Sequence, residues 1–242
     1  MKFYYIIPVN QEVVYKRCLE PSFGIVKPTA YGREVVCVKG DASAVQMSIF
    51  KKYNAIINIL RSRIAPDDVV VFLHEDITIR DPWLEHKVLA YFKEYPQVAV
   101  AGVIGTTVLP EEGGWWLVDR KTQTRGHILQ GHPDATPHHM VERVGQFDDL
   151  VSVDGCVMFV RGAYVLSYPF DQDSYSGYHF YDLDYCIGAL MNGFKVGVVD
   201  VLVEHASEGP LNESWKTQRD VFVKKWKAKG LVFPITKEAF VK

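Results

Sequence analysis

The segment VVVFLHEDITI, residues 69–79, decides the fold class of this chain. It begins with five consecutive apolar residues and stops abruptly at His74, Glu75 and Asp76. An unbroken apolar run, rather than an alternation of apolar and polar residues, is typical of a strand covered on both faces, as in parallel sheets. Open parallel sheets bind ligands beyond the carboxyl ends of their strands. The three polar residues therefore stand where a ligand site is expected.

Further short, apolar, β-branched segments predict more strands of this kind, at residues 3–9, 35–38, 98–103 and 196–203. Apolar residues at helical spacing predict helices at residues 43–63, 83–95 and 182–192. Asp81-Pro82 is a favourable helix start, and Gly193 is a favourable left-handed helix end. The alternation of strands and helices predicts an α/β fold, with a mostly parallel central sheet and helices on both faces.

Residues 105–150 show little periodicity, and they contain Gly113-Gly114, Trp115-Trp116 and the histidines His127, His132, His138 and His139. A long irregular region in a compact domain is usually a functional loop. The spacing of the histidines fits no closed zinc site. We therefore expect one domain, in which a regular α/β half is followed by a loop-rich half.

Composition excludes several classes of protein. A net charge of −2 argues against a nucleic-acid binder. No apolar run approaches the roughly 20 residues that span a bilayer, so we expect a soluble protein with at most peripheral membrane contact. The cysteines are far apart, lie among apolar residues and form no CxxC pair, which predicts buried thiols and a reducing, cytoplasmic location; they are Cys18, Cys37, Cys156 and Cys186.

A cluster of basic residues near the end of the chain has two interpretations. It consists of Lys224, Lys225, Lys227 and Lys229. The cluster is either the solvated face of a last helix or a contact for an anionic membrane or substrate.

A second acidic region lies in the other half of the sequence. Asp182 and Asp184 open a predicted helix after the aromatic-rich GYHFY, and the predicted strand at 196–203 ends in Glu204-His205. Each acid has a plain alternative as a helix N-terminal charge or a solvated turn. However, two buried strands that both end in an acid and a histidine favour a shared metal site. Carboxylate and imidazole groups suit Mg²⁺ or Mn²⁺, which could bridge to a diphosphate.

In its motifs the sequence resembles the family 2-like glycosyltransferases of the GT-A fold, especially the subgroup named after a streptomycin-biosynthesis protein. The resemblance covers residues 3 to about 226. It rests, in chain order, on IIPVN (6–10), VVVFLHEDI (69–77), GGWW (113–116), DGCVMFVRG (154–162) and GYHFYDLDYCIGALMNGFKVGVV (177–199). The last of these motifs is the most specific.

This resemblance implies transfer of one sugar from a nucleotide-diphosphate donor to an acceptor hydroxyl, assisted by Mn²⁺ or Mg²⁺ and with inversion at the anomeric carbon. The acceptor would be a glycan, a lipid-linked molecule or a small molecule. Residues 1–104 would form the nucleotide-binding half of a single GT-A domain, residues 1–242. Residues 105–242 would form its acceptor and catalytic half.

Site residues follow from matching positions. Asp76 and His205 would be metal ligands, and Asp182 would be the general base, ionised at neutral pH without an unusual pKa. His74 and Tyr181 stand where the family usually has acids. The implied nucleotide contacts are Pro8, Asn10, Glu12, Asp41, Asn54, His74 and Glu75. The implied sugar or acceptor contacts are Trp115, Trp116, Asp154, Gly155, His179, Tyr181 and Asp184. Of the two indoles, Trp116 is the one that we expect to contact a sugar.

Two other functions remain open. His74 and Tyr181, where acids are expected, leave room for a non-catalytic nucleotide-sugar or glycan-binding module. A metallohydrolase would use His74, Asp76 and the loop histidines. No GxSxG motif marks a serine nucleophile.

Overall fold

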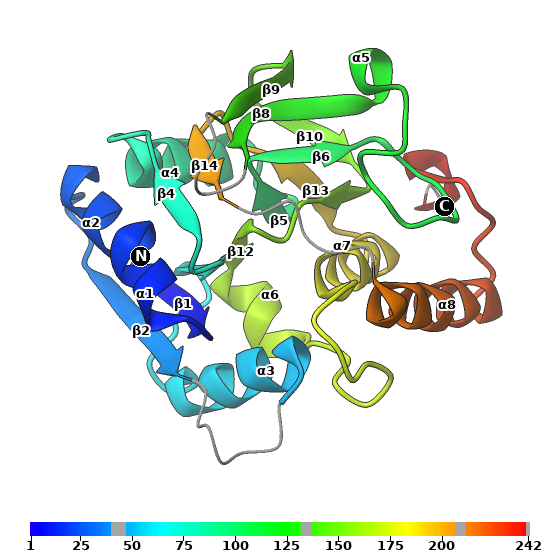
Figure 1. The fold of residues 1–242 in the computed structure, drawn as a ribbon, viewed down its shortest axis with the longest axis horizontal. Helices are drawn as coiled ribbons and strands as arrows, with labels where there is room; N and C mark the ends of the chain where they lie inside the picture. The colour runs from blue at the N-terminus through cyan, green and yellow to red at the C-terminus, as the bar shows by residue number, and fades with distance from the viewer. Residues whose placement is uncertain (40–46, 132–136, 207–211, 241–242) are drawn as a thin grey trace.

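A computed structural model describes residues 1–39, 47–131, 137–206 and 212–240, and a seven-stranded mixed sheet lies at its centre. The order of strands is β10-β13-β5-β12-β3-β1-β2 (Figure 1). Their bounds are β1 Phe3–Val9, β2 Arg33–Lys39, β3 Val69–Leu73, β5 Val98–Gly102, β10 Phe147–Leu150, β12 Val157–Arg161 and β13 Lys195–Val198. Strands β1, β2 and β3 are parallel, as are β5 and β13, whereas β12 runs antiparallel between β3 and β5.

Both faces of this sheet are covered, as the apolar runs predict. Successive side chains of a strand point to opposite faces, so Tyr4 and Ile6 join one core while Phe3, Tyr5 and Ile7 join another. The first core includes residues of α3 (Ile49–Leu60), α6 (Gly162–Ser167), α7 (Tyr181–Met191) and α8 (Glu213–Ala228). The second includes residues of α2 (Leu19–Ser22), α4 (Leu84–Glu94) and a second sheet. The expected α/β architecture is confirmed.

The second sheet crosses the region that we expected to be largely irregular, and that expectation was wrong. Its strand order is β11-β6-β8-β14-β4, with β9 paired to β8. The bounds are β4 Ile77–Ile79, β6 Ile104–Thr106, β8 Thr124–Gln130, β9 His138–Arg143, β11 Ser152–Val153 and β14 Val203–His205. These strands are either very short or, like β8, only partly buried along their length. They therefore lack the continuous apolar run that identified β1, β2, β3, β5 and β13 in the central sheet, where β10 and β12 were not predicted.

Smaller elements complete the chain. They are α1 Glu12–Arg17, η1 Phe23–Ile25, α5 Arg120–Gln123, η2 Lys237–Phe240 and the strands β7 Val108–Leu109 and β15 Ile235–Thr236, which pair with each other. In the part of the chain that the structure describes, no helix has the length and apolar character needed to cross a membrane. The four cysteines are free; three are buried as expected, and Cys37 is half-buried.

Several predicted boundaries shift for local reasons. Helix α3 begins at Ile49 because the Ser48 side chain accepts the Lys51 N–H at 3.4 Å. Helix α4 begins at Leu84, just after Trp83, whose N–H donates to the Asp81 carboxylate at 2.8 Å. Helix α7 ends near Gly193, whose φ of +80° is the left-handed conformation that we predicted.

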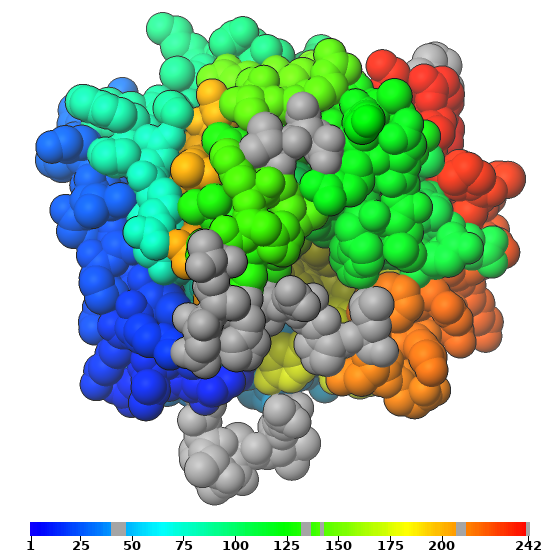
Figure 2. All heavy atoms as spheres, turned by 45° about the horizontal axis from the view of Figure 1, so that its top comes forward, coloured from blue at the N-terminus to red at the C-terminus, as the bar shows by residue number. Residues whose placement is uncertain are grey.

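The segment at residues 196–203 differs most from its prediction, because it is two strands in two sheets. Strand β13 ends at Val198 in the central sheet, and the chain then enters the second sheet as β14. Strand β14 pairs antiparallel with β4, so that His205 lies opposite Ile77, the residue that follows Asp76. Strands β4, β14 and β8 lie side by side on the molecular surface (Figure 2). This pairing brings the two acidic strand ends together.

Candidate active site

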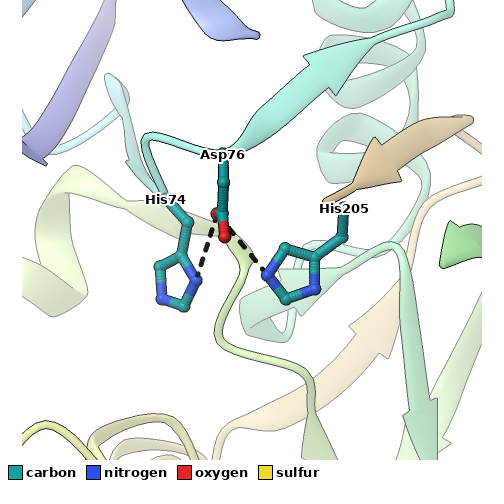
Figure 3. Close-up of side chains that lie close together, drawn as sticks. All are labelled: His74, Asp76 and His205. Atoms are coloured by element: carbon teal, nitrogen blue, oxygen red, sulfur yellow. Dashed lines mark ion pairs between the residues drawn. The ribbon is translucent and has the colours of Figure 1, made fainter. Parts of the chain in front are cut away.

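A histidine–aspartate–histidine cluster lies where β3 turns into β4. His74 and Asp76 come from this turn, and His205 comes from the end of β14 (Figure 3). The His205 Nε2 atom lies 3.5 Å from Asp76 Oδ1, and His74 Nδ1 lies 4.0 Å from the same oxygen. Each residue offers a ligand atom within 4.8 Å of the other two. The structure thus brings Asp76 and His205 together and adds His74 to them.

The chemistry of the cluster fits a divalent cation. Asp76 Oδ1 and His205 Nε2 are buried and have no hydrogen-bond partner among the described residues. Buried polar atoms without a partner are costly, so such atoms usually indicate a bound group. Burial also lowers the pKa of His74, despite the nearby Asp76 carboxylate, and this favours the neutral imidazole that binds metals.

The outward-facing nitrogens of the two histidines are held by neighbours. His205 Nδ1 lies 3.3 Å from the Gln130 Oε1 atom. His74 Nε2 lies 2.6 Å from the Tyr181 hydroxyl, which donates to the Gly155 carbonyl at 2.7 Å. Such outer contacts fix the orientation and tautomer of metal-binding histidines.

A pocket of about 310 Å³ adjoins the cluster. Its walls contain nine of the residues that the sequence singled out: His74, Trp115, Trp116, Asp154, Gly155, His179, Tyr181, Asp182 and His205. They come from the β3–β4 turn, the segment after β7, the β11–β12 connection, the start of α7 and the end of β14. Segments that are far apart in the sequence therefore form one concave site.

Asp182 lies in the first turn of α7, and its environment raises the pKa of its carboxyl to about 7. Burial is the main cause, followed by the charge of Asp154. Hydrogen bonds from the N–H groups of Gly155 at 2.8 Å and Leu183 at 2.9 Å oppose the increase without cancelling it. Our expectation of an ordinary pKa was wrong because sequence does not show that distant segments enclose Asp182, which is half-buried. A pKa near 7 is well suited to a general base.

The two adjacent indoles occupy different environments. Trp115 is 5% exposed, and its ring N–H donates to Asp154 Oδ2 at 3.1 Å. Trp116 is 36% exposed and packs edge-to-face on Trp115 with ring centroids 5.8 Å apart. The preceding Gly113 has a φ of +78°, and a Cβ atom there would lie 2.4 Å from the ring of Phe180, another residue of the pocket wall. Trp115 thus anchors the wall, and Trp116 offers a ring to the pocket.

The loop after β1 is tied to the β3–β4 turn. Glu75 Oε2 accepts the N–H groups of Asn10 at 2.7 Å and Gln11 at 2.9 Å. Lys52 donates to the Asn10 side chain at 2.8 Å, and its Nζ lies 5.0 Å from the Tyr178 ring centroid at the pocket wall. Sequence reasoning missed Lys52 because lysine on an amphipathic helix usually lies at the surface. Its side chain is instead buried here.

Among the described residues, three more that were predicted to contact the nucleotide do not line the pocket. Pro8 is buried within β1, and exposed Glu12 forms ion pairs with Lys16 and Lys39. The Asn54 amide holds the chain at Phe170, donating to its carbonyl at 2.8 Å and accepting its N–H at 2.9 Å. Asp41 lies outside the described residues.

Asp184 points away from the pocket, toward α8, and its surroundings give it a packing role instead of the predicted acceptor contact. Its carboxylate accepts from Lys225 at 2.7 Å, the Trp226 ring N–H at 2.9 Å and the Tyr175 hydroxyl at 2.9 Å. Lys225 therefore differs from the other lysines of the basic cluster. It is not part of a simple solvated face.

The loop histidines do not join the His74 cluster. His127 lies between Asp200, with 3.0 Å between Nε2 and Oδ1, and His139, at 3.3 Å. His138 lines the pocket, and His132 lies outside the described residues. Across the described ranges, the group that brings three ligand atoms together is His74, Asp76 and His205. This arrangement gives no support to a metallohydrolase that depends on the loop histidines.

A family comparison extends these observations to almost the whole chain. Residues 4–226 match the model of a glycosyltransferase-like family. The chain belongs to this family. It is accordingly an enzyme of the glycosyltransferase class, and the match spans both the β3–β4 turn and the Asp182 helix. A sequence search of curated proteins found no match.

Solved structures confirm the GT-A fold of this glycosyltransferase. S. aureus TarS, residues 1–349, superposes with a TM-score of 0.55 at 13% identity, over 99% of this chain and 68% of that one. A longer TarS structure superposes with a TM-score of 0.58 at 12% identity, over 99% of this chain and 41% of the TarS chain. GalNAc-T7, crystallised with UDP, GalNAc and Mn²⁺, superposes with a TM-score of 0.56 at 8% identity, over 89% of this chain and 45% of the GalNAc-T7 chain. This chain thus spans less than half the length of GalNAc-T7.

Proposed function

We propose that this glycosyltransferase is a metal-dependent, inverting enzyme that moves one sugar from a nucleotide-diphosphate donor to an acceptor hydroxyl. The observation that carries the proposal is one pocket with two kinds of chemistry. His74 and His205 of the cluster line it, and so does Asp182, a carboxyl with a pKa of about 7. A metal-dependent transferase that proceeds through a single displacement requires both groups.

His74, Asp76 and His205 would hold the cation, which we take to be Mn²⁺ or Mg²⁺. When bound, such an ion stabilises the charge that develops on the leaving diphosphate. GalNAc-T7, which shares the fold, was crystallised with UDP, GalNAc and Mn²⁺, and this supports the assignment of donor and metal.

Asp182 would remove the proton from the acceptor hydroxyl. Its two backbone hydrogen bonds, from Gly155 and Leu183, hold the carboxylate in a fixed orientation at the pocket wall. At neutral pH a carboxyl with this pKa is about half ionised, and a positioned base of this kind typically contributes 10²–10⁴-fold to the rate. Direct attack by the acceptor needs no covalent enzyme intermediate and gives inversion.

The donor and acceptor would lie on opposite sides of the cluster. Residues 1–104 would bind the nucleotide through the β1 loop and the β3–β4 turn, where Asn10, Glu75 and Lys52 are linked by hydrogen bonds. Residues 105–242 would bind the sugar and the acceptor, with Trp116 as a platform for the C–H face of a sugar. The acceptor is a glycan, a lipid-linked molecule or a small molecule.

Two finer assignments complete the proposal. We propose that the chain belongs to the subgroup named after a streptomycin-biosynthesis protein, because its motifs resemble those of that subgroup. Four free thiols support a reducing, cytoplasmic location.

The test combines binding with turnover. Protein stripped with EDTA is heated with a panel of nucleoside diphosphates, with and without Mn²⁺ or Mg²⁺, and the stabilising nucleotide then identifies nucleotide sugars for transfer and donor-hydrolysis assays. We expect the nucleotide to raise the Tm only when metal is present. Stabilisation that is independent of metal would contradict the proposal.

The Asp182→Asn variant separates binding from chemistry. It should retain metal-dependent nucleotide binding and lose roughly 10²–10⁴-fold in kcat, because only the proton transfer is removed. Full activity in this variant would exclude Asp182 as the base. If wild-type protein binds a nucleotide sugar but neither transfers nor hydrolyses it, the chain is a binding module instead.

A further inference from the structure

We propose that Tyr181 is a positioning residue that fixes His74 as a metal ligand, and that the resulting site selects transition-metal ions over Mg²⁺. The inference rests on the metal-dependent function proposed above and makes its metal requirement specific. It is carried by a chain of hydrogen bonds that runs from the cluster into the protein backbone.

The direction of each hydrogen bond in this chain follows from chemistry. The Gly155 carbonyl can only accept, so the single proton of the Tyr181 hydroxyl points to it across 2.7 Å. The hydroxyl oxygen is then left to accept at 2.6 Å from His74, whose Nε2 must carry the proton. A neutral imidazole protonated on Nε2 has its lone pair on Nδ1. Nδ1 is the atom that faces Asp76 Oδ1 at 4.0 Å.

Tyr181 is held too firmly to release His74 by swinging away. The residue is buried in the first turn of α7, and its ring packs edge-to-face against Tyr53 and Phe50, with centroids 5.7 and 6.3 Å apart. A Cβ atom at Gly155 would lie 2.3 Å from the Tyr181 hydroxyl, so that oxygen sits directly against the backbone. The Tyr181 hydroxyl therefore holds the His74 imidazole in one orientation.

His205 presents its ring in the complementary way. Its Nδ1 lies 3.3 Å from Gln130 Oε1, which as an oxygen accepts the proton. Its Nε2 then carries the lone pair, is buried, and faces Asp76 Oδ1 at 3.5 Å. Both rings thus offer an unprotonated nitrogen to one carboxylate oxygen.

The donor set determines which ions the site prefers. Two neutral imidazole nitrogens and one carboxylate favour first-row transition metals, whereas Mg²⁺ prefers carboxylate, carbonyl and water oxygens. The Irving–Williams series places Mn²⁺ below Co²⁺ in affinity, and Zn²⁺ is a further ion that imidazole ligands suit. Mg²⁺ should bind more weakly than all three.

The first experiment uses the metal ions alone. EDTA-stripped full-length protein is titrated calorimetrically with the chlorides of Mg²⁺, Mn²⁺, Co²⁺ and Zn²⁺, and Co²⁺ binding is also followed by visible absorption. We expect one site per chain that His205→Ala abolishes, with Co²⁺ binding at least roughly tenfold more tightly than Mg²⁺. His74→Asp should reduce the difference between the Co²⁺ and Mg²⁺ affinities, because a carboxylate oxygen replaces an imidazole nitrogen as a ligand. Equal affinities for Mg²⁺ and Co²⁺ in the wild type would overturn the inference.

The second experiment isolates Tyr181. Tyr181→Phe should lower Co²⁺ affinity by roughly tenfold and change the Co²⁺ absorption, as loss of an outer contact to a ligand does. Tyr185→Phe is the matched control, since Tyr185 lies on the same helix, is also buried and donates its hydroxyl to the Tyr168 carbonyl at 3.0 Å. This control should leave Co²⁺ binding unchanged.

A double-mutant cycle distinguishes positioning from packing. If Tyr181 acts through His74, the effect of Tyr181→Phe on Co²⁺ affinity disappears in a His74→Ala background. An equal effect in both backgrounds would assign Tyr181 to packing alone and refute its positioning role. If Tyr181→Phe fails to fold, the wild-type metal series and His74→Asp still decide the selectivity.

These outcomes also separate the inference from the proposed function. Equal binding of Mg²⁺ and Co²⁺ refutes the selectivity and leaves metal-dependent transfer standing. Failure to bind any of the four ions refutes both the inference and the metal dependence of the proposed function.

Discussion

At the scale of single residues, Asp182 and Asp154 are two acids that line one pocket. Burial raises the pKa of Asp182 to about 7, and the Asp154 charge adds to the increase. Because the base must be ionised to accept a proton, we expect kcat/KM to rise with pH through about 7 and then level. A profile that is already flat at pH 6 would contradict this assignment.

Asp154→Asn should shift the rising part of the pH profile of kcat/KM, its acidic limb, to lower pH. Removal of a like charge favours the ionised form of Asp182, so its pKa falls. The measurement is the pH profile of kcat/KM in both proteins, and the midpoint of the limb is the quantity compared, whatever happens to the maximal rate. A limb that stays in place or moves upward would show that Asp182 does not control it.

Trp116 should contribute to acceptor or sugar binding. Its exposed ring lies at the pocket, so Trp116→Ala should raise the KM for the acceptor or donor sugar by roughly tenfold without a large loss of stability. Trp83 is the matched control because it is also an exposed indole but is not part of the pocket wall. Equal effects of the two substitutions would remove Trp116 from the site.

Sequence identified some members of the site and missed the properties of others. Asp76 and His205 were recognisable because each ends an apolar run. The orientation of the His74 ring was not predictable, since its Nε2 contacts Tyr181, which is remote in the sequence. Lys52 and the pKa of Asp182 were missed for the same reason, because both follow from burial by distant segments.

At the scale of elements, a buried ion pair joins α7 to α8. Lys225 and Asp184 are largely shielded from solvent, so Lys225→Met should destabilise the protein by about 3 kcal/mol by leaving a buried carboxylate without its cation. Urea unfolding measures the loss. The metal cluster lies elsewhere, so metal affinity of the folded protein should not change.

Lys227 provides the matched control on the same helix. Its ion pair with Glu111 is exposed, with side chains 49% and 52% accessible, and such pairs contribute about 0–1 kcal/mol. Lys227→Met should therefore leave the free energy of unfolding almost unchanged. A loss as large as that of Lys225→Met would show that helix packing, rather than the buried charge, dominates.

The elements that sequence predicted best are those whose burial is uniform. Strands β1 and β3 have the predicted bounds, since every residue in each is buried. Strand β12 was not predicted, and apolar runs do not encode strand direction, so its antiparallel position could not have been foreseen either. The division of residues 196–203 into β13 and β14 reflects a change of sheet, which no local pattern marks.

At the scale of the whole molecule, the raised pKa of Asp182 has a cost in stability that depends on pH. The pKa of Asp182 is about 7 in the folded chain, against 3.8 for an ordinary aspartate. Between these values the folded state binds more protons than the unfolded state, so the contribution of Asp182 to stability falls as pH rises through this window. Below about pH 4 both states are protonated, and the cost vanishes.

Comparison with Asp182→Asn tests this linkage. The variant cannot ionise, so its free energy of unfolding relative to wild type should rise by on the order of 1–3 kcal/mol between pH 4 and pH 8. Urea unfolding of metal-free protein at several pH values provides the measurement. A difference between the two proteins that does not vary with pH would mean that Asp182 is not shielded in solution as it is in this structure.

The backbone of Gly155 contacts residues from both parts of the proposed chemistry, metal binding and proton transfer. Its carbonyl receives the Tyr181 hydroxyl that orients His74, and its N–H binds the Asp182 carboxylate. The N–H and the carbonyl of Gly155 belong to two successive peptide planes, which the backbone torsion angles of Gly155 join. A small change in these angles would therefore disturb the orientation of His74 and the proton affinity of Asp182 in the same movement. A substitution near Gly155 that is intended to change metal binding should therefore also change the pKa of Asp182, and the reverse, because the backbone of one residue contacts both groups.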